Sequence, residues 1–121
     1  MAEQFLKLSV EARRADAESC IAKRGDDHHP ILAIAHRGTP AASKFKYAMQ
    51  GDTPFGHLTA AIRAKIPNLD ASTALFLFIA QPDGGSILAP PTKTVREVYS
   101  AYLHTDKFLH VTYALENVFG Y

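Results

Sequence analysis

The chain has 121 residues, 47% hydrophobic and 21% charged, which is typical of one soluble globular domain. Its net charge of +1 argues against non-specific nucleic-acid binding, and no apolar run approaches the roughly 18 residues of a transmembrane helix. The single cysteine, Cys20, excludes an internal disulfide and favours a reducing compartment, which we expect to be the cytoplasm.

The first predicted element is a helix that follows Ser9, a candidate N-cap. Three apolar residues fall on one face of this helix: Val10, Ala17 and Ile21. The turn that begins at Gly25 ends it.

Two strands are predicted next. Residues 31–35 form an apolar run of strand length. Over residues 44–49 apolar and basic side chains alternate, which indicates a strand with one face on a core. The predicted core row is Phe45, Tyr47 and Met49, and the predicted outer row includes Lys44 and Lys46. Charge on the outer row suits an edge strand, because it discourages pairing with other chains.

A second helix is predicted over residues 54–66, with Thr53 as N-cap and Pro54 at the first helical position. Its apolar residues recur at spacings of three and four: Phe55, Leu58, Ile62 and Ile66. Residues 74–79 are apolar on both faces, which favours a central strand covered on both sides.

The C-terminal part is predicted to hold a turn, a short helix and a last strand. Residues 81–86 contain Asp-Gly-Gly and indicate a turn. Thr94 and Glu97 have the spacing of a capping box that opens a helix. In the strand over residues 108–113, the predicted inward row is Leu109, Val111 and Tyr113.

This order of elements predicts an α+β fold. A right-handed crossover through the 54–66 helix would make the 44–49 and 74–79 strands parallel. A β-grasp with a four-stranded mixed sheet satisfies these constraints. We expect one domain over residues 1–121, with an N-terminal helical segment (1–29), a core (30–114) and a flexible C-terminal tail (115–121).

Several blocks of the chain resemble the autophagy-related protein 8 family of ubiquitin-like modifiers, the GABARAP and microtubule-associated protein light chain type. They include residues 74–79, residues 108–113 and the closing Glu-Asn-Val-Phe-Gly of residues 116–120. The closing block is the most specific, because it follows the tyrosine-containing strand at the family's distance. The resemblance spans nearly the whole chain and implies the ubiquitin-like version of the β-grasp.

The resemblance implies that the protein is a substrate of other enzymes and not itself an enzyme. A processing cysteine protease would cut after Phe119 and Gly120 and remove Tyr121. Activating and conjugating enzymes would then pass Gly120 to the amine of phosphatidylethanolamine. Glycine suits these narrow sites because it has no Cβ. The two acyl chains would hold the product on autophagosomal membranes, while the free protein stays cytoplasmic.

The resemblance also implies that receptor and cargo proteins dock aromatic-x-x-aliphatic peptides as an added strand beside residues 44–49. The implied aromatic pocket is lined by Ile21, Pro30, Lys46, Ala48 and Phe108. The implied aliphatic pocket involves Tyr47, Met49, Leu58 and Ile62, with Arg63 next to it in a matching block. Lys44 and Lys46 would attract acidic residues that flank such peptides.

Four residues depart from the family pattern in this region: Ala48, Gln50, Thr53 and Ala61. They remove apolar wall, so we expect pockets that are wider or shallower than usual.

The sequence gives little support for a metal site, a catalytic cysteine or a cofactor site. The run Asp26-Asp27-His28-His29 lies in one turn, lacks a distant ligand set and predicts no metal site. Cys20 has no catalytic motif partner, and no cofactor fingerprint is present. Two alternatives to the lipid-conjugated modifier stay open: a tag conjugated to a protein lysine, and an unconjugated peptide-binding trafficking adaptor.

Overall fold

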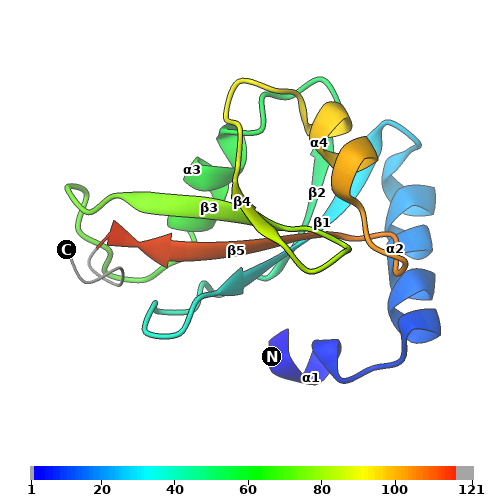
Figure 1. Cartoon of the computed structure of the whole chain (residues 1–121), viewed down its shortest axis with the longest axis horizontal. Coiled ribbons are helices and arrows are strands. Elements are labelled where there is room, and N and C mark those ends of the chain that lie inside the picture. Colours follow the sequence, from blue (N-terminus) through cyan, green and yellow to red (C-terminus); the bar gives the residue numbers. More distant parts are fainter. Residues whose placement is uncertain (1, 117–121) are drawn as a thin grey trace.

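The computed structural model describes residues 2–116, which form a five-stranded sheet with helices on both faces (Figure 1). The elements in chain order are α1 (Ala2–Leu6), α2 (Val10–Arg24), β1 (His28–Ala35), β2 (Lys46–Gln50), α3 (His57–Arg63), β3 (Leu75–Ala80), β4 (Ser86–Leu88), α4 (Val95–Tyr102) and β5 (Leu109–Leu115). No helix within residues 2–116 is both long enough and apolar enough to cross a membrane.

The strand order in the sheet is β2-β1-β5-β3-β4. β1 is antiparallel to β2 and parallel to β5, while β3 is antiparallel to both β5 and β4. β2 and β3 therefore run in the same direction, as the predicted crossover requires, although β1 and β5 lie between them. The predicted α+β class and ubiquitin-like fold are confirmed.

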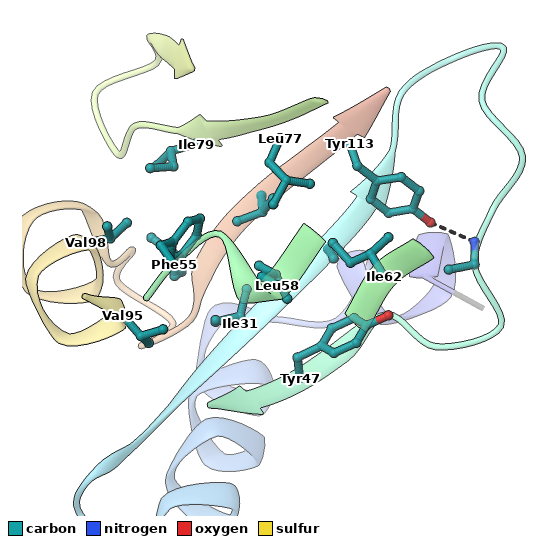
Figure 2. Close-up of a cluster of buried hydrophobic side chains, with 14 of the residues drawn as sticks. Ile31, Tyr47, Phe55, Leu58, Ile62, Leu77, Ile79, Val95, Val98 and Tyr113 are labelled. Atoms are coloured by element: carbon teal, nitrogen blue, oxygen red, sulfur yellow. Dashed lines mark hydrogen bonds between the residues drawn. The ribbon is translucent and has the colours of Figure 1, made fainter. Parts of the chain in front are cut away.

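The main core lies between one face of the sheet and helices α3 and α4 (Figure 2). The helices contribute fully buried apolar residues, namely Leu58, Ile62, Val95 and Val98. Alternate residues of the strands meet them, among them Ile31, Leu77, Ile79, Val111 and Tyr113. Each side chain of this size stabilises the fold by roughly 1.5–3 kcal/mol on burial. The predicted inward rows of α3 and β5 are confirmed.

A second, smaller core lies on the opposite face of the sheet and joins it to α1 and α2. It consists of Phe5, Ala17, Leu32 and Phe108. The ring of Phe5 meets Phe108 edge-on, with 5.7 Å between centroids. This cluster holds the N-terminal helices against the sheet.

Local capping agrees with the sequence prediction at two helices. Ser9 Oγ accepts a hydrogen bond from the backbone N–H of Ala12 at 3.1 Å, and Gly25 follows α2 with φ of 106°. Thr94 and Glu97 form the predicted capping box of α4.

The sheet has one strand more than the four predicted. The turn over residues 81–85 is a hairpin closed by the Gln81 N–H and the Gly85 carbonyl at 2.7 Å, with Gly84 at φ of 109°. It leads into β4, which spans only three residues and pairs with β3. So short a strand is invisible to a search for alternating hydrophobicity, because alternation needs about four residues.

The predicted start of α3 is wrong. The helix begins at His57, and its N-cap position, Gly56, makes no side-chain cap. Thr53 and Pro54 instead pair with the segment before α4: the N–H of Val95 donates to the Thr53 carbonyl at 2.9 Å, and Pro54 forms an isolated bridge with Thr94. This long-range pairing overrides the local helix-start signal.

Two predicted strand orientations also differ from the structure. Phe45 packs against the second core, not beside Tyr47, because β2 begins only at Lys46 and the alternation does not extend before it. β3 is flanked by β5 and β4 but is not covered on both faces, since Phe76 keeps 37% exposure. The central strand is β5. The sheet also begins at His28 and β5 extends to Leu115, slightly outside the predicted core range.

Candidate peptide-docking edge

β2 is an edge strand, as predicted. Within residues 2–116 it pairs only with β1, in a register that places Ala48 opposite Pro30 and Lys46 opposite Leu32. The backbone groups on its outer side are therefore available to an added strand.

A pocket of about 230 Å³ opens between α2 and β2. Five of the residues assigned to the site from the sequence line it: Lys44, Lys46, Tyr47, Ala48 and Phe108. The α2 side of the pocket is made by Asp16, Ser19, Cys20, Lys23 and Arg24. A pocket between a helix and a free strand edge, lined by Ala48 and Phe108 as well as by charged side chains, has the form of a receptor for one large side chain.

The other two residues assigned to the aromatic pocket lie nearby but outside its lining. Pro30 is buried in β1 next to Ala48, and Ile21 is half-buried on α2. Cys20 lines the pocket in place of its neighbour Ile21.

Sequence reasoning missed the α2 wall, although a signal for it exists. Asp16, Ser19, Cys20 and Lys23 recur at spacings of three and four, so they share a stripe of the helix. The stripe acquires a role only when α2 docks beside β2, a contact that local sequence does not reveal.

Positive charge dominates the pocket rim. Lys46 Nζ lies 3.0 Å from Asp16 Oδ2 and 5.0 Å from the centroid of the Phe5 ring. Lys44 Nζ lies 4.9 Å from the centroid of the Tyr47 ring. Each such exposed contact contributes at most about 1 kcal/mol, so the lysines act mainly by attracting anionic partners.

Most residues assigned to the aliphatic pocket belong to the main core. Leu58 and Ile62 have 0% exposure, and Met49 is half-buried and packs against the same core. The Tyr47 hydroxyl donates to the Lys44 carbonyl at 3.1 Å. Burial, with a smaller contribution from Tyr113, raises the pKa of Tyr47 to about 12. Tyr47 is therefore a neutral core residue whose edge reaches the pocket.

Arg63, also assigned to this site, faces the connection between α3 and β3. Its Nη2 donates to the carbonyls of Ala71 and Thr73. The structure thus gives Arg63 a role in holding that connection.

Asp106 joins α2 to β5 and to Phe108, which lines the pocket. This carboxylate is 1% exposed and accepts hydrogen bonds from Arg13 Nε at 3.0 Å, the Phe108 N–H at 3.0 Å and His110 Nε2 at 2.9 Å. Burial raises the pKa of Asp106, but the bonds from Phe108 and Arg13 and the proximity of His110 outweigh it, so the net pKa is lowered. Because Phe108 lines the pocket and α2 forms its wall, this cluster fixes the pocket's geometry.

His110 lies next to this cluster. Its ring stacks on His104 with 3.9 Å between centroids, and His104 Nε2 donates to the Ala80 carbonyl at 2.7 Å. Burial lowers the pKa of His110, and His104 and Arg13 lower it further against the opposing effect of Asp106. His110 is thus held mainly neutral at neutral pH.

The protein-family model described as "Autophagy protein Atg8 ubiquitin like" matches residues 12–120 of the chain. The chain belongs to the Atg8 family. This match covers β1 to β5, the docking edge and the expected conjugation end, Phe119 and Gly120. Phe119, Gly120 and Tyr121 lie outside the residues that the structure describes.

Individual Atg8 proteins support this membership. Autophagy-related protein 8 of Kluyveromyces lactis is 32% identical over 118 residues, covering 94% of this chain and 88% of the relative. Autophagy-related protein 8 of Dictyostelium discoideum is 30% identical over 112 residues, covering 92% and 88%. Autophagy-related protein 8a of Arabidopsis thaliana is 29% identical over 124 residues, covering 99% and 96%.

The fold is also shared with a solved Atg8 structure. The crystal structure of Trypanosoma brucei ATG8 matches with a TM-score of 0.76 over 92% of this chain and 91% of that chain, at 23% identity. At this identity the match shows the fold alone.

Proposed function

We propose that this Atg8-family protein is a lipid-conjugated modifier of autophagy with no catalytic activity of its own. A processing cysteine protease removes Tyr121, and activating and conjugating enzymes transfer the Gly120 carboxyl to phosphatidylethanolamine. The observation that carries the proposal is the family match, which extends through Gly120. A terminal glycine suits acyl transfer because no side chain hinders approach to its carbonyl.

The second part of the proposed function is peptide docking at the β2 edge. Receptor and cargo proteins would add a strand to β2 and place an aromatic side chain of an aromatic-x-x-aliphatic motif in the pocket beside α2. Three observations support this: the outer side of β2 has no partner strand within residues 2–116, the pocket holds about 230 Å³, and its rim is rich in lysine.

The protein would divide between two locations. The unconjugated form would stay in the cytoplasm, and the conjugate would reside on autophagosomal membranes, because two acyl chains give stable anchoring where one does not.

Conjugation is tested by comparing three forms of the protein in cells with active autophagy. The wild type and a variant that ends at Gly120 are expected to enter the membrane fraction, the shorter form without any need for the protease. Gly120→Ala is expected to remain in the supernatant. Membrane recruitment of Gly120→Ala equal to that of wild type would support the trafficking adaptor and contradict conjugation.

The two conjugation branches are separated by the chemistry of the bond. Phospholipase D hydrolyses the ester between phosphate and ethanolamine, so it would release the protein from membranes with ethanolamine on Gly120 and leave phosphatidic acid behind. Phospholipase D would leave an isopeptide bond to a protein lysine intact, and tandem mass spectrometry of a resistant conjugate would identify that lysine.

A further inference from the structure

His29 is a titratable side chain in a row of core residues. It stands two positions before Ile31 and four before Ala33 in β1, and these two residues belong to the main core, so His29 lies on the same face of the sheet. Its ring stacks on the ring of Tyr99 in α4, with 4.6 Å between centroids and 23° between the ring planes. His29 is therefore half-buried between the sheet and the second turn of α4.

The Nε2 atom of His29 is buried and has no hydrogen-bond partner among residues 2–116. A neutral imidazole can carry its proton on the other ring nitrogen, but a protonated imidazole must present an N–H donor at Nε2 as well. Burying a donor without an acceptor is costly, and more so when the group is charged. The packing beneath α4 therefore favours the neutral ring.

The charged groups around His29 strengthen this preference. Burial and then the positive charge of Arg96, on α4, lower the pKa of His29; Asp27 opposes them, His28 adds to them, and the net pKa is lowered. Arg96 is held at this end of the sheet, because its Nη1 lies 2.5 Å from Asp52 Oδ1.

The remaining neighbours of His29 do not supply a counter-charge. Met49, which faces it across the β1–β2 ladder, does not titrate. Tyr99 stays neutral at physiological pH, because burial raises the pKa of its hydroxyl, with smaller effects from Asp106 and Cys20. The face of the Tyr99 ring would attract an imidazolium, but a ring face does not accept the proton of a buried N–H as a carboxylate would.

The two turns of α4 are held to the rest of the molecule in different ways. The backbone of the first turn donates two hydrogen bonds, each 2.9 Å long, to the turn that follows β2. The second turn makes side-chain contacts: Val98 enters the main core (Figure 2), while Tyr99 packs on His29 and its hydroxyl donates to the Lys107 carbonyl at 2.5 Å. Loss of the ring contact would therefore loosen the second turn before the first.

We propose that the contact between His29 and Tyr99 is a pH-sensitive latch: the second turn of α4 packs on the sheet while the His29 ring is neutral and is released when the ring is protonated. This inference goes beyond the proposed conjugation and peptide docking and depends on neither, because it concerns only how α4 is held to the sheet.

The direction of the pH effect follows from proton binding. Above about pH 6.5, the pKa of an imidazole in water, the ring is neutral in the latched and the released state, so pH has no effect. Below it the released state binds a proton more readily, so release becomes more favourable as pH falls. Between pH 7.5 and 5.5 the release equilibrium can rise by at most about tenfold.

Hydrogen exchange of the α4 amides at pH 7.5 and 5.5, corrected for the intrinsic pH dependence of exchange, measures this release. The wild type is expected to lose protection severalfold at the lower pH. His29→Phe keeps a ring against Tyr99 but cannot be protonated, so its protection is expected to change by less than about twofold. His57→Phe makes the same chemical change at an exposed residue of α3 and is expected to behave as the wild type.

Circular dichroism checks that each variant keeps the fold, and His29→Val serves as the non-titrating variant if His29→Phe does not. A loss of protection in the non-titrating variant within twofold of the wild-type loss would overturn the latch. A pKa of the His29 ring, measured by NMR, at or above that of the exposed His57 would overturn it too. Either result would leave the proposed conjugation and peptide docking intact.

Discussion

Asp106→Ala is expected to destabilise the protein strongly although it lies outside the main core. The carboxylate is 1% exposed and binds Arg13, His110 and the N–H of Phe108. Its removal leaves the Arg13 guanidinium without its carboxylate and the buried N–H of Phe108 without an acceptor, and breaking a buried pair in this way costs about 3–5 kcal/mol. Arg13 keeps hydrogen bonds to the carbonyls of Leu6 and Leu8, which favours the lower end of that range.

A loss of about 3 kcal/mol is large compared with the roughly 5–15 kcal/mol by which domains are usually stable. For a chain of this length it corresponds to a fall in Tm of about 10–15 °C. Urea unfolding followed by circular dichroism at neutral pH measures the free energy directly. Asp83→Ala, in the exposed hairpin, is the matched control and is expected to change the free energy by less than about 0.5 kcal/mol.

A double-mutant cycle shows whether the cost of Asp106→Ala comes from the pair. Arg13→Ala should cost clearly less in the Asp106→Ala background than in wild type, because its main partner is already absent. An Asp106→Ala variant within about 1 kcal/mol of wild type, or additive effects in the cycle, would refute the assigned role of this cluster.

Three further predictions concern pH and hydrogen bonding. The pKa of His110 is lowered in the folded state, so the neutral ring stabilises the fold fully above the unfolded pKa of about 6.5, and this stabilisation is lost as pH falls. The urea midpoint of the wild type should therefore decrease as the pH is lowered from about 7.5 to 5.5, and that of His110→Gln should decrease less. Equal decreases for both proteins would contradict this. Tyr113→Phe leaves the buried N–H of Ala42, now 2.7 Å from the hydroxyl (Figure 2), without an acceptor and should cost about 1–3 kcal/mol in urea unfolding; a neutral effect would show that water replaces the hydroxyl. Thr94→Ala removes the α4 cap that binds the N–H of Glu97 and should cost about 1 kcal/mol, with a smaller loss for Thr94→Ser; equal losses would contradict a capping role.

Features that depend on neighbours in sequence were predicted well. The Ser9 cap, the capping box at Thr94 and the spacing of Leu58 and Ile62 each depend on residues within about one or two helical turns. The same locality explains why Lys46 could be placed on an exposed edge.

Features set by distant contacts were not predictable in this way. Thr53 and Pro54 have the sequence of a helix start, but they pair with the segment around Thr94 and lie outside the helix. The Asp106 cluster depends on Arg13, which is distant in sequence and meets it only when α2 docks. The α2 wall of the pocket depends on the same docking. The periodicity of a sequence indicates which face of a helix is apolar. It does not indicate which strand edge the polar face of that helix will lie beside.

Conjugation is tested most directly by the intact mass of the protein recovered from starved cells. We expect a population that lacks the mass of Tyr121 and carries the added mass of phosphatidylethanolamine on Gly120. A protein that always retains Tyr121 and never carries a covalent partner would contradict it.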